Sequence, residues 1–472
     1  MKTQKRHFNL VSLGCPKNRV DSERILFVMD NAGFIFTHDP AVSDVIIINT
    51  CAFIEDAVEE SIQAILNYRA EHRESFLVVA GCMPLRYRDE LRKSLPEVDL
   101  FITPDQIPDL PTILQGSTMS RVQHHQVLSQ GEHTPLSHIA SFNDQVEDRS
   151  ISREDGRTIT GAERILSTPG YAYLKIAEGC NRSCRYCTIP AIRGPLRSVS
   201  TDALVEEVRF LARSGAREVV LTAQDLTSYG VDRNEKRGLL RLLERISAIN
   251  GIQWIRLMYL HPNGIPRGLA RLIGESENIL PYLDIPFQHI SDKVLRSMGR
   301  PWKGDRLRKL VDSLREEING LVLRTTLMVG FPTEGDNEFK ELQEFVESYR
   351  IEHVGVFEYS PEEGTPAFDL GDPVPRKVKR SRAAAIRRIN SRYVTRRNQR
   401  RIGSVERGMV ESVSQESEFL LQGRAWDQAP EVDGILYIVE GEAQAGEIHR
   451  VTITGAHGPD LFGAIENEQC QA

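Results

Sequence analysis

Residues 1–142 repeat one hydrophobic pattern three times. In each repeat an apolar run ends at a cysteine and leads into a stretch with apolar residues at helical spacing, which predicts a strand, a loop and a helix. The runs are FNLVSLGC, DVIIINTC and SFLVVAGC, ending at Cys15, Cys51 and Cys82. Alternating strands and helices predict a parallel sheet, whose ligands bind where the strands end. We therefore expect the three thiols to converge, the alternative being three buried structural cysteines.

The pattern changes after this domain. Residues 143–169 are polar, charged and without apolar periodicity, which predicts a linker. Residues 170–403 again alternate strand-like runs with helical stretches, which predicts a complete or partial α/β barrel. The expected strands are GYAYLKIAEGC, REVVLTAQD, WIRLMYLHP, YLDIPFQH, LVLRTTLMVGFP and HVGVFEYSP.

The end of the chain carries two further elements. Residues 376–401 hold twelve Lys or Arg and no acid, which predicts a basic helix; a solvated surface helix is its simplest interpretation. Residues 404–466 contain four short strand-like runs separated by turn residues, which predicts a small β-barrel. Together the patterns indicate an α/β multidomain protein.

Composition narrows the class of protein. A chain of 472 residues is too long for one core, and 40% apolar with 26% charged residues is typical of a globular protein. The start lacks the apolar run of a signal peptide, and no stretch reaches the ~18 apolar residues that cross a bilayer. We expect a cytoplasmic chain without membrane contact. Seven cysteines without a secretion signal favour metal-binding or catalytic thiols over a disulfide framework.

Three of these cysteines, Cys180, Cys184 and Cys187, lie in the stretch EGCNRSCRYCTIP. A structural zinc site needs four ligands, and no Cys or His follows within twenty residues, so zinc fits less well. Three thiolates can hold three irons of a four-iron cluster and leave the fourth open for a substrate or cofactor.

This spacing, with Tyr186 before the last cysteine, resembles the radical S-adenosylmethionine superfamily. The resemblance implies a 4Fe-4S cluster on Cys180, Cys184 and Cys187 whose open iron binds S-adenosylmethionine and cleaves it to a radical. It also implies cofactor-side positions at Tyr186, Gln224 and Gly330.

The whole chain resembles one subgroup, the methylthiotransferases, which implies an N-terminal three-cysteine domain over 1–142, a radical barrel with a basic helix over 170–403, and a TRAM-type barrel over 404–466. It further implies a second 4Fe-4S cluster, which carries the transferred sulfur, on Cys15, Cys51 and Cys82. One S-adenosylmethionine would methylate that sulfur and a second would supply the radical. Cys470 is then incidental. We expect a monomer that receives electrons from a donor such as flavodoxin or ferredoxin.

The segments SLGCPKNRVDSE and GRAWDQAPEVDGILYI resemble the branch that modifies the β-carbon of an aspartate on a small-subunit ribosomal protein, the twelfth. That C–H is unactivated, so a radical rather than a general base must act. Residues 404–466 carry twelve acids against three Lys or Arg, which favours a basic protein partner; acids such as Glu431 and Asp433 are expected to form the docking surface. Solubility is the simpler explanation of this acidity.

Two other functions stay open at this point. The transfer RNA branch modifies an adenosine next to the anticodon, and the basic helix at 376–401 could touch transfer RNA or ribosomal RNA. Alternatively, both cysteine sets could hold clusters for electron transfer or iron sensing, without cleaving S-adenosylmethionine.

Overall fold

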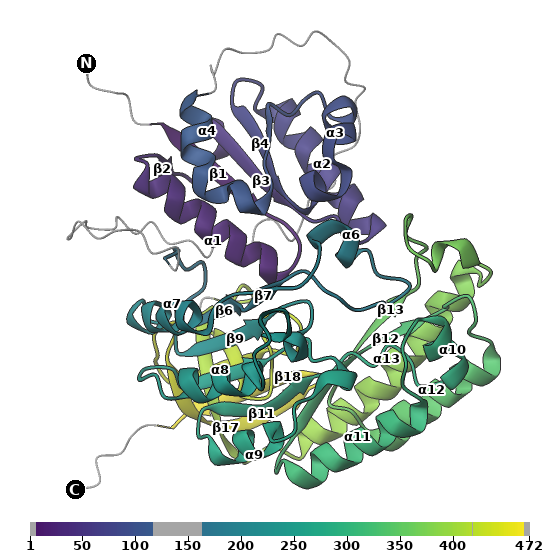
Figure 1. Cartoon of the computed structure of the whole chain (residues 1–472). Coiled ribbons are helices and arrows are strands. Elements are labelled where there is room, and N and C mark those ends of the chain that lie inside the picture. Colours follow the sequence, from purple (N-terminus) through teal and green to yellow (C-terminus); the bar gives the residue numbers. More distant parts are fainter. Residues whose placement is uncertain (1–5, 117–162, 418, 467–472) are drawn as a thin grey trace, which may run out of the picture. The chain divides into compact units, whose positions relative to one another are not determined.

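The computed structural model describes residues 6–116, 163–417 and 419–466 (Figure 1). They form two compact units: one contains the residues up to Thr168 together with Thr188–Gly194, and the other contains Pro169–Cys187 and the chain from Pro195 on. Cys470 and most of the predicted linker lie outside the described residues. Within the described ranges, no helix has both the length and the apolar character needed to span a bilayer.

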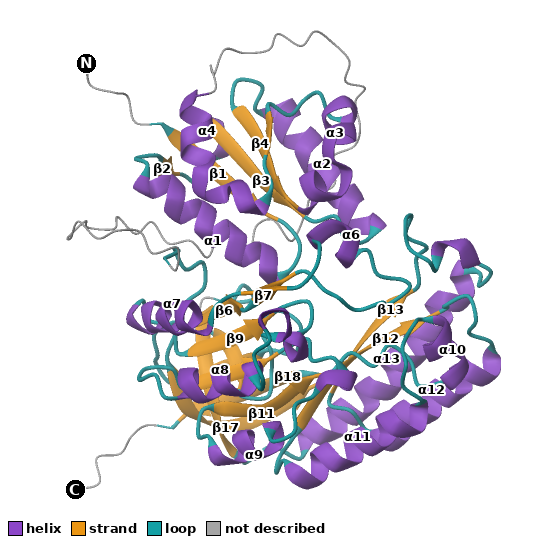
Figure 2. Cartoon of the chain, viewed as in Figure 1, coloured by secondary structure: helices purple, strands orange, loops and turns teal. Residues whose placement is uncertain are grey.

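The N-terminal unit is built on a parallel sheet with the strand order β2-β1-β3-β4-β5 (Figure 2). Its strands are β1 (His7–Ser12), β2 (Ile35–Phe36), β3 (Val45–Thr50), β4 (Phe76–Gly81) and β5 (Leu100–Phe101). Its helices are α1 (Pro16–Asn31), α2 (Glu55–Glu71), α3 (Cys82–Ser94) and α4 (Leu110–Gly116). The three predicted strand and helix pairs and the parallel sheet are confirmed.

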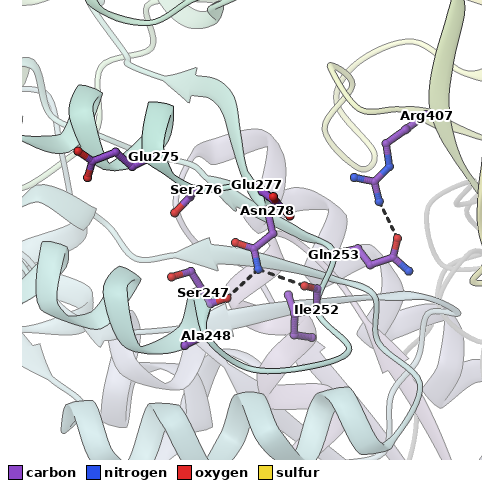
Figure 3. Close-up of a pocket in the computed structure, with 9 residues that line it drawn as sticks. All are labelled: Ser247, Ala248, Ile252, Gln253, Glu275, Ser276, Glu277, Asn278 and Arg407. Carbon is purple, nitrogen blue, oxygen red and sulfur yellow. Dashed lines mark hydrogen bonds between the residues drawn. The ribbon is translucent and has the colours of Figure 1, made fainter.

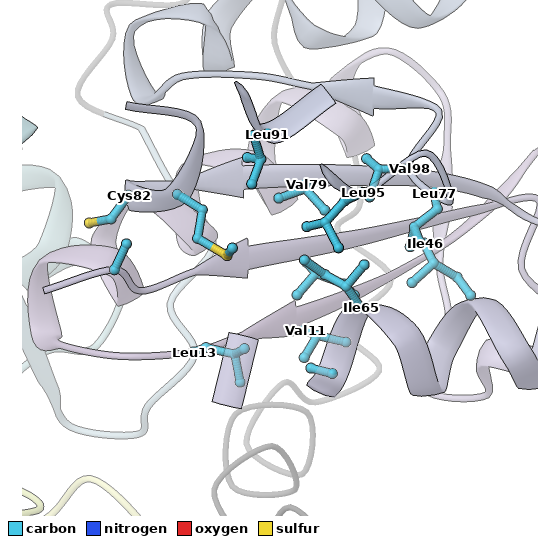
Figure 4. Packing of buried hydrophobic residues seen from close by; sticks show 14 of the residues in the cluster. Val11, Leu13, Ile46, Ile65, Leu77, Val79, Cys82, Leu91, Leu95 and Val98 are labelled. Atoms are coloured by element: carbon cyan, nitrogen blue, oxygen red, sulfur yellow. The ribbon is translucent and has the colours of Figure 1, made fainter. Parts of the chain in front are cut away.

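The three inner strands, β1, β3 and β4, are buried on both faces, and their side chains alternate between the two sides of the sheet. In β3, Val45 and Ile47 join the apolar cluster under α1 and α4, while Ile46 and Ile48 join the cluster under α2 and α3. Figure 4 shows this second cluster, with Ile46 among its residues. All four side chains are at most 1% exposed. Fully burying each of them stabilises the fold by about 1.5–3 kcal/mol.

Two segments outside the repeats complete this unit. Within the stretch predicted as linker, Arg164 pairs with Glu23 of α1 at 2.7 Å and the Ser167 hydroxyl donates to the same carboxylate at 2.7 Å. Helix α6 (Ile189–Arg193) contributes Ile192 to the cluster under α2 and α3. The unit is therefore discontinuous in sequence, since α6 comes directly after the Cys180–Cys187 loop.

The second unit begins with a parallel sheet of six strands in the order β13-β12-β11-β10-β9-β6. The strands are β6 (Tyr171–Lys175), β9 (Glu218–Thr222), β10 (Trp254–Leu257), β11 (Ile279–Asp284), β12 (Val322–Val329) and β13 (His353–Glu358). The helices between them are α7 (Thr201–Arg213), α8 (Gly238–Ser247), α9 (Leu269–Glu275), α10 (Asp292–Ser297), α11 (Gly304–Glu317) and α12 (Asp336–Tyr349). Since β6 and β13 stay unpaired with each other, the expected barrel is a partial one. A short antiparallel pair, β7 (Ala177–Glu178) and β8 (Arg197–Ser198), flanks the cysteine loop.

The chain then forms the predicted basic helix, α13 (Arg376–Gln399), and a closed barrel. The barrel strands are β14 (Val405–Val413), β15 (Leu421–Ala425), β16 (Leu436–Glu440), β17 (Ile448–His457) and β18 (Asp460–Ile465). The hydrophobic pattern predicted only four strands. It missed β18, which pairs with β17 across a turn at Gly458, where φ is +58°.

The acids of this barrel differ from the expectation that they form a free docking surface. The Asp433 side chain is 2% exposed, accepts a hydrogen bond from Tyr282 at 2.7 Å and lies 3.2 Å from His353 Nδ1. Asp427 is fully buried between Arg397 and Arg401. Glu431 accepts a hydrogen bond from the Tyr171 hydroxyl at 3.2 Å. Part of the acidity therefore attaches the barrel to α13 and the six-stranded sheet. Asp433 is not available to a partner, whereas Glu431 stays exposed despite its contact with Tyr171, so its role in docking stays a prediction.

Candidate active site

The loop after β7 carries Cys180, Cys184 and Cys187, all partly exposed. The Cys187 amide donates to the Cys184 carbonyl at 3.2 Å, and the Arg182 amide donates to the Cys180 sulfur at 3.4 Å. Burial raises the pKa of the Cys180 thiol, and the neighbouring Asp225 and Cys184 raise it further. The loop therefore carries three thiols at the end of the sheet where the parallel strands finish.

Tyr186 belongs to this loop and anchors it to the rest of the domain. Its ring packs against the apolar cluster around Met298 and Phe331, and its hydroxyl accepts from Arg300 Nη2 at 3.1 Å. Arg300 is fixed by a second bond to the Pro286 carbonyl at 2.9 Å. Burial raises the pKa of the Tyr186 hydroxyl, so this group stays protonated. Tyr186, predicted to lie on the cofactor side, orients the loop through its ring and through Arg300.

A polar network beside Cys180 was not anticipated from the sequence. Asp225, which follows β9, pairs with Arg182 at 2.7 Å and accepts from the hydroxyls of Thr227 and Ser228 at 2.6 Å each. Burial alone raises the pKa of the Asp225 carboxyl, but Arg182 and the two hydroxyls outweigh it and hold the pKa below its usual range. The signal that could have found it is an Asp, Thr and Ser run directly after a predicted strand.

His261 lies at the end of the next strand along the sheet. Burial, together with the charges of Arg300 and Arg182, lowers the pKa of its imidazole to about 3. Its Nδ1 accepts from the Asn263 amide at 3.2 Å, which assigns the proton to Nε2. The site therefore contains a neutral hydrogen-bond donor among fixed charges.

The other two predicted cofactor-side residues lie at strand ends but in different surroundings. Gln224, just after β9, donates to Glu178 at 3.3 Å, and Glu178 pairs with Lys175 at 2.8 Å. Gly330 directly follows β12 with φ of +74°, and a Cβ there would lie 2.4 Å from Cγ of Lys379. Its amide donates to Glu334 at 2.7 Å. Gln224 thus lies next to the cysteine loop, whereas the backbone of Gly330 is held against α13.

The N-terminal unit gathers the other three thiols. Burial, with Cys15 and Cys82 as the next contributions, raises the pKa of the Cys51 thiol to about 12. Burial likewise raises the pKa of Cys82, and Cys15 contributes. A Cβ on Gly14 would lie 2.6 Å from Cβ of Cys51, so only glycine lets these two loops approach so closely. The predicted convergence of Cys15, Cys51 and Cys82 agrees with this mutual influence; their role as ligands stays a prediction.

The two cysteine sets fit iron–sulfur clusters by their chemistry, since each offers three thiols and thiolates are the ligands of such clusters. A four-iron cluster asks each thiolate to bind a different iron. Thiols whose pKa burial has raised need a positive centre to hold them as thiolates, and bound iron is such a centre.

A hollow of about 490 Å³ lies elsewhere in the second unit (Figure 3). Its lining includes Gln253 and Asn278, the residues directly before β10 and β11, and Arg407, which donates to Gln253 at 2.6 Å. It is therefore at the amino ends of the strands, opposite the edge that carries the cysteine loop.

Comparison with known proteins decides the family. The chain is 42% identical over 468 residues to the ribosomal protein uS12 methylthiotransferase RimO of Trichlorobacter lovleyi, covering 98% of this chain and 99% of that protein. It is 40% identical to the protein of the same name from Aquifex aeolicus, covering 96% of each. The chain belongs to the RimO family of ribosomal protein uS12 methylthiotransferases. The predicted resemblance is confirmed.

Three family profiles match successive parts of this RimO-family chain. They are Uncharacterized protein family UPF0004 over residues 7–103, the Radical SAM superfamily over 174–346 and the TRAM domain over 402–465. Among solved structures, a radical S-adenosylmethionine methyltransferase, TsrM from Kitasatospora setae, superposes with a TM-score of 0.52 at 14% identity and covers 77% of this chain and 74% of that one. At this identity the likeness concerns the fold alone.

Proposed function

We propose that this enzyme transfers a methylthio group to the β-carbon of an aspartate on the small-subunit ribosomal protein uS12. The observation that carries the proposal is the similarity, over nearly the whole chain, to uS12 methylthiotransferases, in a chain that presents two separate sets of three thiols. The reaction has two tasks, forming a radical and supplying sulfur, and each set of three cysteines would serve one of them.

In this proposal Cys180, Cys184 and Cys187 would hold one 4Fe-4S cluster, and Cys15, Cys51 and Cys82 would hold the second. When bound, the first cluster with S-adenosylmethionine supplies a carbon radical able to remove hydrogen from an unactivated C–H bond. The rest of the site orients and shields that chemistry: Tyr186 and Arg300 fix the cysteine loop, and Asp225 fixes Arg182 beside Cys180. His261 keeps its Nε2 proton at neutral pH and so offers a hydrogen bond without adding a charge.

Two exposed surfaces could contact the partners. Glu440 and Glu442 are exposed at the end of β16, and their charge suits a basic ribosomal protein. Changing both to Lys should weaken uS12 binding and flatten its salt dependence. Equal binding by the folded variant would remove this surface from the proposal.

Helix α13 supplies the second surface. Lys379 and Arg382 are buried and bonded to Tyr359 and Glu334, so they belong to the fold. The exposed cations of the helix are Arg376, Lys377, Arg380, Arg387, Arg388, Arg392 and Arg396, and the exposed Arg400 directly follows its end. With no acid among residues 376–401, this face suits the phosphates of ribosomal RNA in a small subunit that carries uS12.

A pair of matched triple variants tests the RNA contact. Both replace three exposed arginines by alanine: one set on α13 (Arg380, Arg388, Arg396) and one elsewhere in the same unit (Arg213, Arg241, Arg267). Only the first should weaken binding to ribosomal RNA and lower the slope of affinity against salt concentration. Equal losses in both would mean that net charge, and not this helix, attracts the RNA.

One anaerobic assay tests the function itself. The monomeric enzyme, with reconstituted clusters, S-adenosylmethionine and an electron donor (flavodoxin, ferredoxin or dithionite), is given either a uS12 peptide or transfer RNA. Mass spectrometry should find the added methylthio mass on the aspartate of the peptide. Modification of transfer RNA alone would assign the chain to the other branch, and bound iron without cleavage of S-adenosylmethionine would favour an electron-transfer or sensor protein.

A further inference from the structure

Arg193, the last residue of α6, points its guanidinium at the N-terminal thiols. Its side chain is 3% exposed, and Nη2 lies 2.9 Å from the Cys82 sulfur and 2.9 Å from Oδ1 of Asn18. Nη1 lies 3.7 Å from the Asp21 carboxylate. A buried cation therefore contacts one of the three sulfurs expected to bind iron.

Asn18 holds this guanidinium in its orientation. Its side-chain amide donates to the carbonyls of Leu13 at 3.0 Å and Thr50 at 2.9 Å, so Oδ1 must face the opposite way, toward Arg193. Leu13 and Thr50 belong to the chain just before Cys15 and Cys51, and Asn18 is itself fully buried. One amide thus connects the first two cysteine loops and orients the cation on the third cysteine.

We propose that Arg193 is a positioning residue for the N-terminal cluster, donating a hydrogen bond to the Cys82 sulfur and stabilising the cluster in its more negatively charged states. The inference rests on the proposed second cluster and adds to it the group that sets its electrostatics. Arg193 binds neither substrate nor iron.

The physical reason is the charge that accumulates at this site. Three thiolates, and a sulfide awaiting transfer, make the buried site negative, and an added electron makes it more so. Hydrogen bonds to sulfur and nearby charge set the potentials of such clusters, and burial leaves the attraction of a cation poorly screened. Removing Arg193 should therefore make reduction of this cluster harder and shift its midpoint potential to more negative values.

A purely structural role predicts something different. If Arg193 only paired with Asp21 and Asn18 to hold α6 in place, its loss would lower thermal stability and leave the cluster's potential unchanged. Arg69 is a matched control for that role, since it is largely buried, pairs with Asp99 at 2.5 Å and lies in the same unit near the amino ends of the strands.

The test uses the full-length chain with Cys180, Cys184 and Cys187 changed to Ala, so that only the N-terminal cluster assembles. In this background the parent, Arg193→Gln, Arg193→Lys and Arg69→Gln are reconstituted anaerobically, and iron content and midpoint potential are measured by EPR-monitored redox titration. Arg193→Gln should shift the potential negative, Arg193→Lys should recover part of the shift because the charge remains, and Arg69→Gln should match the parent. Iron lost from Arg193→Gln at an unchanged melting temperature, and kept by Arg69→Gln, would equally support the contact.

Two results would overturn the inference in distinguishable ways. If Arg193→Gln keeps its iron at the parent's potential, Arg193 has no electrostatic role, and the two-cluster function is untouched. If the parent background binds no iron, the second cluster is absent, and the proposed function fails together with the role of Arg193.

Discussion

The Arg424 guanidinium of the C-terminal barrel lies 2.6 Å from the Glu218 carboxylate at the start of β9, and both side chains are at most 3% exposed. Glu218 also binds Arg256 at 2.6 Å. Burial alone raises the pKa of the Glu218 carboxyl, but the two arginines hold it below its usual range. The barrel is thus attached to the six-stranded sheet through a buried carboxylate that Arg256 and Arg424 share.

Replacing Arg424 by Met should destabilise the second unit by up to about 3–5 kcal/mol, because the buried Glu218 carboxylate then keeps only one of its two cations and Glu411 loses the guanidinium that lies 2.6 Å away. Arg450→Met is the control in the same barrel, since Arg450 pairs with Glu466 at 2.8 Å but is 71% exposed; its cost should stay within about 1 kcal/mol. Denaturant unfolding measures both. Similar costs would show that the buried pair does not couple the two domains.

The radical site should lose all activity when Cys180, Cys184 and Cys187 are changed to Ala together. Iron per chain should fall from about eight to about four after anaerobic reconstitution, because one three-thiolate set remains. Formation of 5′-deoxyadenosine should cease. Full iron content, or continued cleavage of S-adenosylmethionine, would contradict the assignment of this loop.

The N-terminal thiols should act separately from radical formation. Cys51→Ala should abolish methylthiolation of uS12 while reductive cleavage of S-adenosylmethionine continues, because the cysteine loop of the second unit is intact. Cys470→Ala, the one cysteine without an expected role, is the control and should methylthiolate normally. A Cys51→Ala enzyme as active as the parent would return Cys15, Cys51 and Cys82 to a structural role.

Two glycines allow the cost of a strained backbone to be measured separately from the cost of a steric clash. Gly320 and Gly330 have φ of +68° and +74°, but a Cβ on Gly320 would meet nothing within 4 Å, whereas one on Gly330 would meet Lys379 at 2.4 Å. Gly320→Ala should cost about 1–2 kcal/mol from the left-handed backbone alone. Gly330→Ala should cost about 1–3 kcal/mol more, because Lys379 is buried and must move. Equal melting temperatures in the two variants would contradict the tight packing of α13 on this turn.

Asp427 should make the barrel sensitive to acid. Burial alone raises the pKa of its carboxyl, but Arg401 and Arg397 lower it far more. A carboxyl whose pKa is depressed in the folded state stabilises the protein above its unfolded pKa of about 3.9, and the contribution is lost as pH falls toward the folded value. The iron-free wild-type chain should therefore melt progressively earlier below about pH 4. Asp427→Asn should be less stable at pH 7 and change less with acid; a parallel decline of both would contradict this.

The sequence predicted the strands and helices well, because buried apolar side chains recur at short, regular spacings along the chain. Residues 45–48 alternate between two apolar clusters, and Cys51 follows the strand end at Thr50 as the pattern predicted. The polar contacts could not be predicted in this way. Arg193 and Cys82 are 111 positions apart, and Arg424 and Glu218 are 206 apart, so only the folded chain reveals that these groups meet. For the same reason Asp433 was expected on a surface, although it is buried against Tyr282.

Because the N-terminal unit is discontinuous in sequence, its boundaries matter when it is produced as an isolated domain. A fragment that stops at residue 168 omits Thr188–Gly194, so it lacks the helix that covers the α2 and α3 face and places a cation on Cys82. Such a fragment exposes the apolar neighbours of Ile192 to water, and its Cys82 thiol lacks the Arg193 guanidinium. Failure of that fragment to take up iron would therefore reflect the missing helix, and a fragment that joins residues 188–194 back through a short linker is the proper form of the isolated domain.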